Sequence, residues 1–188
     1  MDARAGQQYV APEGLLRIED CLDERGEIVM PPGTTLIALI DRNVAHIGDT
    51  VAYRYLDYAG GADPHTVEWT WTQLGTRLRA VAAEVQRLAG HGDRVAVLAP
   101  QGLDYIAGFF GAIKAGTIAV PLFAPELPGH AERLDTALRD AGPTVVLTTA
   151  AAAAAVEEFL TTHPPAIRPA ILLDRKSTRL NSSHITIS

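Results

Sequence analysis

The stretch that decides the fold is Gly92–Leu122, which reads GDRVAVLAPQGLDYIAGFFGAIKAGTIAVPL. Within it, Arg94–Ala99 (RVAVLA) is a short, continuous apolar run, which is typical of a strand buried on both faces of a parallel sheet. Leu103–Ala115 then predicts a helix with aliphatic and aromatic side chains, and Thr117–Leu122 predicts the next strand. The stretch therefore predicts a strand–helix–strand unit whose two strands are parallel.

The same alternation continues toward the C-terminus. His130–Ala141 predicts a helix that ends at Gly142, and Thr144–Thr148 (TVVLT) predicts another buried strand. Ala150–Thr161 has the composition of a strong helix, and Ala170–Leu173 begins a further strand. The fold class that follows is α/β, with an open, mostly parallel sheet that carries helices on both faces.

The residues before the sheet predict a short β-hairpin. Val51–Tyr58 (VAYRYLDY) is rich in β-branched and aromatic residues, and Ala59–Pro64 has the composition of a turn. Val67, Trp69 and Trp71 then alternate with polar residues, as they do in a second strand. We therefore expect these two strands to pair before the chain enters the sheet.

A long helix is expected after the hairpin, opened by Thr72 or Gln73 and ended by Gly90. Its apolar residues form one stripe at helical spacing: Leu74, Leu78, Val81, Ala82, Val85 and Leu88. Further upstream, a short helix is expected near Ala38–His46. Residues 1–35 show no sustained period and predict an irregular leader.

Serine divides the chain into two parts. Residues 1–176 contain none, although serine is among the commonest residues in proteins. The four serines occupy the last twelve positions: Ser177, Ser182, Ser183 and Ser188. Alanine does the reverse, because the Ala-rich body stops at Ala170. The chain therefore has the composition of two sequences joined near Asp174.

Composition and charge exclude several classes of protein. Hydrophobic residues make up 47% and charged residues 20% of the 188 residues, so the chain can build a core. Residues 1–174 carry 13 Lys and Arg against 22 Asp and Glu, and a body this acidic is a poor nucleic-acid binder. Since no apolar run reaches about 18 residues and no signal peptide is present, we expect a soluble, cytoplasmic protein without a transmembrane segment.

Catalytic and metal-binding motifs are absent from the sequence. A body without serine has no serine nucleophile, the single Cys21 excludes a disulfide framework, and there is no GxxxxGK[ST] phosphate loop. The six histidines lack the spacing of metal ligands, so each is expected to be a solvated loop residue: His46, His65, His91, His130, His163 and His184. The residues alone therefore assign no catalytic, cofactor-binding or metal-binding site.

Ligands of open α/β sheets bind at the carboxyl ends of the strands. In this chain those ends are expected in three segments: Pro100–Leu103, Phe123–Gly129 and Thr148–Ala150. Phe109 and Phe110 are compatible with an apolar ligand channel, but a role in the core is favoured because a helix that covers a sheet needs such residues. Three glycines are expected to serve close helix packing and a helix end: Gly108, Gly111 and Gly116.

Gly92–Leu122 resembles the N-terminal subdomain of adenylate-forming enzymes, the superfamily of acyl- and aminoacyl-activating ligases. The shared pattern is a GDRV-type strand, a proline turn, an aromatic helix with GAxxAG, and a strand that ends in VPL. Val51–Tyr58, Gln101–Ala112 and Pro128–Thr149 look like long-chain fatty acyl-AMP ligases, above all the actinobacterial type that loads fatty acids for mycolic-acid or polyketide lipid synthesis. The resemblance covers about Thr35–Leu173.

This resemblance implies an enzyme that uses ATP and Mg²⁺ to convert a fatty acid to an acyl-adenylate. It further implies transfer of the acyl group to an acyl carrier protein or polyketide synthase. The family's phosphate loop ending in Lys-Gly, its nucleotide-binding motifs and its C-terminal lysine are not in the sequence, so no catalytic residue is assigned and the fragment is expected to be inactive and to bind no cofactor. Phe109 and Phe110 are compatible with the border of the acyl tunnel. Two alternatives stay open: a fatty acyl-CoA ligase fragment and a stand-alone, non-catalytic α/β binding domain.

The expected organisation has three parts. Residues 1–35 form the leader, and residues 36–173 form a partial AMP-binding domain, the incomplete N-terminal subdomain of the adenylate-forming fold. Residues 174–188 (DRKSTRLNSSHITIS) resemble the translation of a sequencing-library adapter. We therefore expect the natural sequence of this piece to end at Leu173 or Asp174.

Overall fold

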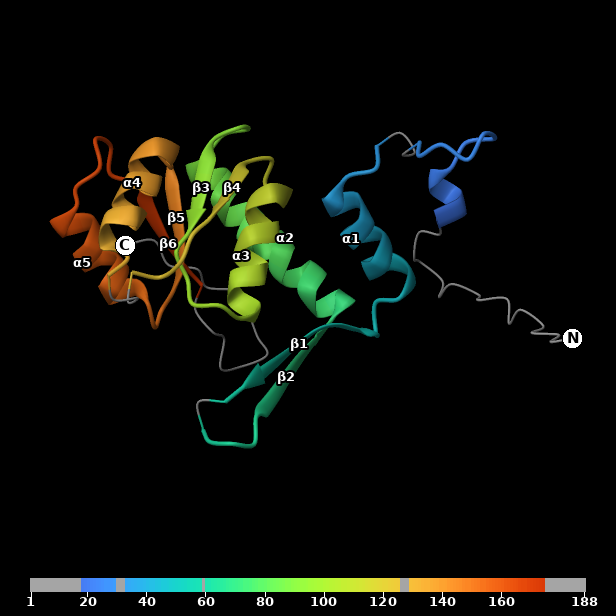
Figure 1. Cartoon of the computed structure of the whole chain (residues 1–188), viewed down its shortest axis with the longest axis horizontal. Helices are drawn as coiled ribbons and strands as arrows, with labels where there is room; N and C mark the ends of the chain where they lie inside the picture. Colours follow the sequence, from blue (N-terminus) through green and yellow to red (C-terminus); the bar gives the residue numbers. More distant parts are fainter. Residues whose placement is uncertain (1–17, 30–32, 59, 126–128, 175–188) are drawn as a thin grey trace, which may run out of the picture.

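The computed structural model describes residues 18–29, 33–58, 60–125 and 129–174 (Figure 1). The sheet predicted from the sequence has four strands: β3 (Arg94–Val97), β4 (Ile118–Pro121), β5 (Val145–Thr149) and β6 (Ala170–Asp174). They are all parallel and lie in the order β4-β3-β5-β6. In the register, Val95 of β3 lies beside Ala119 of β4 and beside Val145 of β5. The predicted α/β class and parallel sheet are confirmed.

Helices cover both faces of this sheet. Figure 1 shows α2 (Trp71–Leu88) and α3 (Leu103–Lys114) on one side of the strands, with α4 (Ala131–Ala141) and α5 (Ala153–Thr162) on the other. Val95 and Val97 belong to the core cluster with α2 and α3, whereas Ala96 and Leu98 belong to the cluster with α4 and α5. Successive side chains of a strand point to opposite faces, so a continuous apolar run is needed to fill both cores.

The predicted hairpin is present upstream of the sheet. Strands β1 (Val51–Asp57) and β2 (His65–Thr70) pair in antiparallel fashion, and in Figure 1 they extend away from the layers of the sheet. Helix α1 (Leu36–His46) packs on α2 and α3, where Ile40 is buried with residues of both helices. Lys114 of α3 adds an ion pair to this contact, with its Nζ 2.7 and 2.8 Å from the two carboxylate oxygens of Asp41.

Helix α2 begins earlier than expected, and the prediction that Trp71 belongs to the second strand is wrong. Thr70 is the N-cap: its Oγ1 accepts a hydrogen bond from the Gln73 backbone N–H (3.2 Å). The Gln73 side chain accepts one in return from the Thr70 N–H (2.9 Å). This reciprocal capping box satisfies two backbone donors and starts the helix at Trp71. The Thr-x-x-Gln spacing was the sequence signal for it.

Helix α5 begins three residues later than predicted. Ala150–Ala152 form a turn instead, in which the Ala152 N–H donates to the Thr149 carbonyl oxygen (3.1 Å) and to its Oγ1 (3.3 Å). Within the predicted leader, the described residues form a short 3-10 helix, η1 (Ile18–Cys21), and an isolated bridge between Leu22 and Ile28. The predicted foreign tail lies outside the described residues except for Asp174.

Close packing of α3 on α2 explains Gly111. A Cβ atom on Gly111 would lie 2.5 Å from Val81 Cγ1 of α2, so only glycine allows the two helices to approach this closely. Gly108 faces the sheet, where a Cβ would lie 3.4 Å from Val97 Cγ1. The prediction that glycine serves close helix packing is confirmed for Gly111, whereas the space beside Gly108 would accept a methyl group. None of the helices in the described residues is both long and apolar enough to cross a membrane.

Candidate functional site

The strand order reverses between β3 and β5. From β3 the chain passes through α3 to β4 on one side, and from β5 it passes through α5 to β6 on the other side. In open α/β sheets such a switch point opens a crevice at the carboxyl ends of the strands. Here the buried Thr148 hydroxyl donates a 2.7 Å hydrogen bond to the Leu98 carbonyl oxygen and ties the two strand ends together.

A cavity of about 770 Å³ lies next to the switch point, at the carboxyl ends of β3 and β4. Its walls come from three elements that meet there: the strand ends, the first turn of α3 and strand β1 of the hairpin. The lining residues are Tyr53, Arg54, Tyr55, Ala99, Pro100, Gln101, Gly102, Leu103, Tyr105, Ile106, Leu122, Phe123 and Ala124. Two of the three predicted segments contribute to it, Pro100–Leu103 and Phe123–Gly129, whereas Thr148–Ala150 does not.

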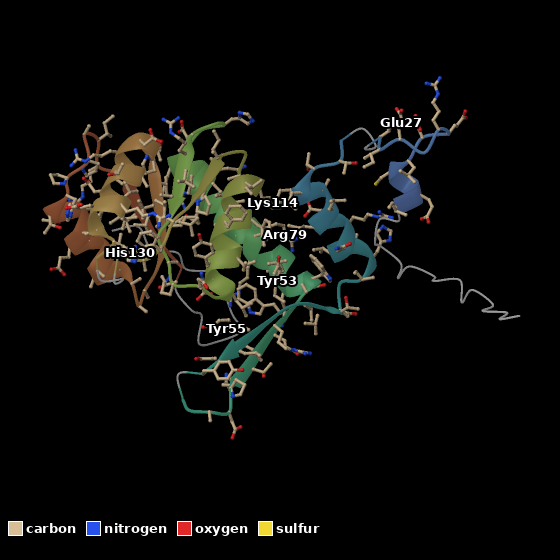
Figure 2. The ribbon with its side chains drawn as sticks, in the orientation of Figure 1. Glu27, Tyr53, Tyr55, Arg79, Lys114 and His130 are labelled. Atoms are coloured by element: carbon tan, nitrogen blue, oxygen red, sulfur yellow. The ribbon has the colours of Figure 1, made fainter. Side chains whose placement is uncertain are left out.

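Tyrosines supply most of the polar groups in the wall of the cavity. The Tyr105 hydroxyl, on the first turns of α3, donates a 3.0 Å hydrogen bond to the Leu122 carbonyl oxygen just beyond β4. This bond joins two walls of the cavity. Burial raises the pKa of Tyr105 and that of Tyr53 above the ordinary value. Figure 2 shows Tyr53 and Tyr55 on the hairpin.

The described lining contains one charged side chain, that of Arg54. Arg54 is already paired across the hairpin, with its Nε 2.5 Å from Glu68 Oε1. The lining contains no carboxylate, histidine, lysine or cysteine among the described residues. Aromatic, aliphatic and backbone surface with a few fixed polar groups is the usual make-up of a site for an apolar ligand.

The described residues contain no preformed metal site made of three or more His, Cys, Asp or Glu side chains. Mg²⁺ is usually bound by one or two carboxylates together with substrate phosphates and waters, and the described cavity lining contains no carboxylate. No step of a reaction is therefore assigned to a metal held by these residues.

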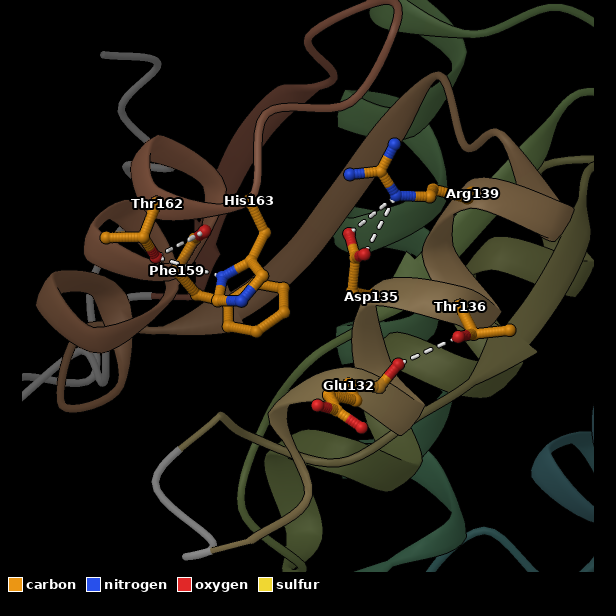
Figure 3. A network of polar contacts seen from close by, with 7 residues as sticks. All are labelled: Glu132, Asp135, Thr136, Arg139, Phe159, Thr162 and His163. Atoms are coloured by element: carbon orange, nitrogen blue, oxygen red, sulfur yellow. Dashed lines mark hydrogen bonds and ion pairs between the residues drawn. The ribbon is translucent and has the colours of Figure 1, made fainter.

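None of the described histidines is part of the cavity lining, although the ring of His130 lies 5.5 Å from that of Phe123, which is. Not all of the histidines lie in loops. His46 is the last residue of α1 and His65 the first of β2, so the prediction of a loop is wrong for these two, although both are exposed. His163 follows α5, where its ring stacks on Phe159 at 4.5 Å and its Nδ1 lies 3.0 Å from Thr162 Oγ1 (Figure 3). His184 lies outside the described residues.

Phe109 and Phe110 do not line the cavity. Their rings meet edge to face, with centroids 5.3 Å apart. Phe110 packs against the core cluster under the hairpin, which consists of Ile40, Trp69, Leu74, Leu78, Leu103 and Ala107. The residues that do line it from the hairpin were not singled out from the sequence. Tyr53 and Tyr55 are two residues apart, so they lie on one face of the predicted strand. This spacing was the sequence pattern that could have indicated the contribution of the hairpin to the cavity.

Three comparisons relate this chain to known proteins. A family model described as AMP-binding enzyme matches residues 40–185. The long-chain-fatty-acid–AMP ligase FadD32 of Mycolicibacterium smegmatis is 45% identical over 147 residues, which is 78% of this chain and 23% of that protein. FadD23 of Mycobacterium tuberculosis, also a long-chain-fatty-acid–AMP ligase, is 51% identical over 100 residues, covering 53% of this chain and 17% of that protein.

Solved structures agree with the sequence relatives. The fatty acyl-adenylate ligase of Legionella pneumophila, solved with acyl adenylate and pyrophosphate, superposes with a TM-score of 0.58 and 26% identity. The superposition covers 71% of this chain and 23% of that one. The resemblance inferred from Gly92–Leu122 is confirmed. The chain spans about a quarter or less of the length of each of these proteins.

Proposed function

Because the chain belongs to the family of AMP-binding enzymes, we propose that it forms part of a ligase that activates a long-chain fatty acid with ATP. The products are an acyl-adenylate and pyrophosphate. The relatives FadD32 and FadD23 are 45% and 51% identical over their matched segments, and both are named long-chain-fatty-acid–AMP ligases. Their names support a long-chain fatty acid as the substrate.

The apolar cavity at the carboxyl ends of β3 and β4 is the structural observation that carries the proposal. Its volume of about 770 Å³ is within the range of about 300–1,000 Å³ in which small-molecule sites fall. An alkyl chain bound there would be removed from water against Leu103, Ile106 and Phe123. Each buried methylene would then stabilise the complex by about 0.8 kcal/mol.

We propose an acyl carrier protein or a polyketide synthase as the acceptor of the acyl group. The support is that the relatives FadD32 and FadD23 are named AMP ligases. Another relative, 42% identical over 115 residues, is named a putative fatty-acid–CoA ligase. Transfer to coenzyme A is the competing acceptor. Incubating the active protein with labelled fatty acid and each acceptor in turn separates the two, because only the true acceptor becomes acylated.

The 188-residue polypeptide is proposed to be inactive alone. Its sequence has no Ser/Thr/Gly-rich phosphate loop ending in Lys-Gly, and the lining of its cavity offers no group for proton transfer or metal binding among the described residues. We expect no fatty-acid-dependent exchange of pyrophosphate into ATP above background. Exchange in purified material would show that these residues suffice.

A chimera tests the activity itself. Residues 36–173 of this chain replace the matching segment of the Mycolicibacterium smegmatis relative, and palmitate-dependent ATP–pyrophosphate exchange is measured. We expect the chimera to be active and the same chimera with Leu122→Asp to lose most activity, because a charge in the apolar cavity is costly to desolvate. A chimera that melts cooperatively but does not respond to palmitate would contradict the proposal.

The assignment of residues 174–188 as a foreign tail is also a proposal. The family match does not support this boundary, because it runs to residue 185. The support is the change in serine and alanine content near Asp174. Reading the source DNA past the codon for Asp174 tests it. Genomic sequence that encodes the four serines would overturn it.

A further inference from the structure

Two tyrosines that line the cavity from different elements, Tyr53 of β1 and Tyr105 of α3, differ in how their hydroxyl groups are used. The Tyr105 hydroxyl is engaged, because it donates to the Leu122 carbonyl oxygen at 3.0 Å. The Tyr53 hydroxyl has no hydrogen-bond partner among the described residues, although its ring is half-buried against the core cluster under the hairpin. A phenol that lines an apolar cavity with its polar atom unused is available to a ligand.

Tyr55, on the same face of β1, also has a hydroxyl without a hydrogen-bond partner among the described residues, but it is 38% exposed. The remaining polar side chains of the lining are paired or face water. Arg54 is paired with Glu68 and its side chain is 61% exposed, so it faces water more than the cavity. Gln101 is also exposed. Tyr53 is therefore the half-buried side chain of the described lining whose hydrogen-bonding capacity is not already used.

We propose that the cavity takes an acyl group with a hydroxyl or similar hydrogen-bonding substituent on its alkyl chain, and that Tyr53 selects this group. The inference rests on the proposed function, in which the cavity holds the acyl chain. Tyr53 donates to the substituent oxygen or accepts from its proton, while the apolar residues around it hold the methylenes.

The size of the expected preference follows from the energy of one hydrogen bond. A neutral hydrogen bond contributes little to the binding free energy, because each group gives up a hydrogen bond to water when it forms. The net contribution corresponds to a preference in affinity of about threefold to tenfold. A wholly apolar wall would show no such preference, since it has no partner to offer a hydroxyl and can only tolerate it.

Ligand binding by the full 188-residue chain tests the inference. Calorimetric affinities are measured for palmitic acid and for monohydroxylated palmitic acids with the hydroxyl near the carboxyl end, in mid-chain or at the far end. We expect one positional isomer to bind about threefold to tenfold more tightly than palmitic acid. Tyr53→Phe should abolish this preference, whereas Tyr58→Phe, an exposed hairpin tyrosine outside the lining, should keep it.

The possible results separate this inference from the proposed function. Palmitic acid binding without preference for any isomer, or a preference that survives Tyr53→Phe, would overturn the role of Tyr53 and leave fatty-acid binding intact. Binding of none of the acids by a chain that melts cooperatively would overturn both. The same comparison of kcat/KM values in the chimera, with and without Tyr53→Phe, checks the result in a catalytically complete protein.

Discussion

Tyr105 is the residue that connects the wall of the cavity to the core. Its ring packs against the cluster shared by α2, α3 and the sheet, and its hydroxyl holds the Leu122 carbonyl at the exit of β4. The same side chain thus stabilises the fold and sets the separation of two cavity walls.

Replacing Tyr105 with phenylalanine should lower the free energy of unfolding by about 1 kcal/mol, because the ring stays packed while the hydrogen bond to Leu122 is lost. Chemical denaturation measures the change. The matched control is Tyr58→Phe, whose side chain is 58% exposed and which should change stability by less than about 0.5 kcal/mol. Equal effects of the two variants would show that the hydroxyl of Tyr105 contributes nothing.

The buried tyrosines also predict how stability changes with pH. Burial raises the pKa of Tyr53 and Tyr105 above the ordinary value of 10.0, so the unfolded chain releases these protons first as the pH rises. Their contribution to stability is fully present below pH 10.0 and is lost as the pH rises through the folded-state values. Denaturation at a series of alkaline pH values should show a smaller loss in the Tyr53→Phe, Tyr105→Phe double variant than in the parent.

At the scale of elements, the packing of α2 on α3 depends on a glycine. Gly111 lets the helix backbones approach until a Cβ would lie 2.5 Å from Val81 Cγ1 and 2.6 Å from Val81 Cβ. Val81 and Ala112 belong to the same buried cluster, so the contact cannot relax into solvent. The position of α3 over the sheet, and with it the α3 wall of the cavity, follows from this contact.

Gly111→Ala should therefore lower the free energy of unfolding by about 1–3 kcal/mol, since the added methyl group overpacks the helix contact. Gly108→Ala on the same helix is the control, because its Cβ would make ordinary contact at 3.4 Å with Val97 Cγ1. There, alanine should be neutral or stabilise the helix by up to about 1 kcal/mol. Thermal melts of both variants measure the difference, and a harmless Gly111→Ala would contradict the close approach.

At the scale of the whole molecule, strand β4 is an edge of the described sheet. Ile118 on this strand is 53% exposed, and an exposed apolar edge strand favours pairing with another chain. Self-association that rises with concentration is expected. Ile118→Glu should reduce it, since the new carboxylate lies in register with Arg94 and a charge protects an edge.

Sedimentation velocity over a range of concentrations measures this association. The matched control is Ile167→Glu, which adds the same charge at an exposed position outside the strands (83% exposed). If both variants reduce association equally, net charge and not the β4 edge is responsible.

The order and type of the elements followed from the sequence because they depend on local pattern. The apolar run at Arg94–Ala99 needs burial on both faces, and only a parallel sheet with helices on each side supplies that. The boundaries were less certain because they depend on single hydrogen bonds. Because of the capping box at Thr70 and Gln73, α2 begins at Trp71, before the predicted start. Because of the turn after Thr149, α5 begins at Ala153, three residues after the predicted start.

The family was also readable from the sequence, because the GDRV strand, the aromatic helix and the VPL strand are contiguous in the chain. Two of the strand-end segments that line the cavity were also predicted, but the contribution of the hairpin was not, since Tyr53 and Phe123 are far apart in the chain. Which hydroxyl is free and which is engaged depends on distances between elements that no spacing along the chain encodes. The sequence therefore determined the class of the fold, its relatives and the strand ends at which a ligand is expected. The tertiary structure alone decided which hairpin residues complete the cavity and that the Tyr105 hydroxyl is engaged, because both depend on contacts between distant elements.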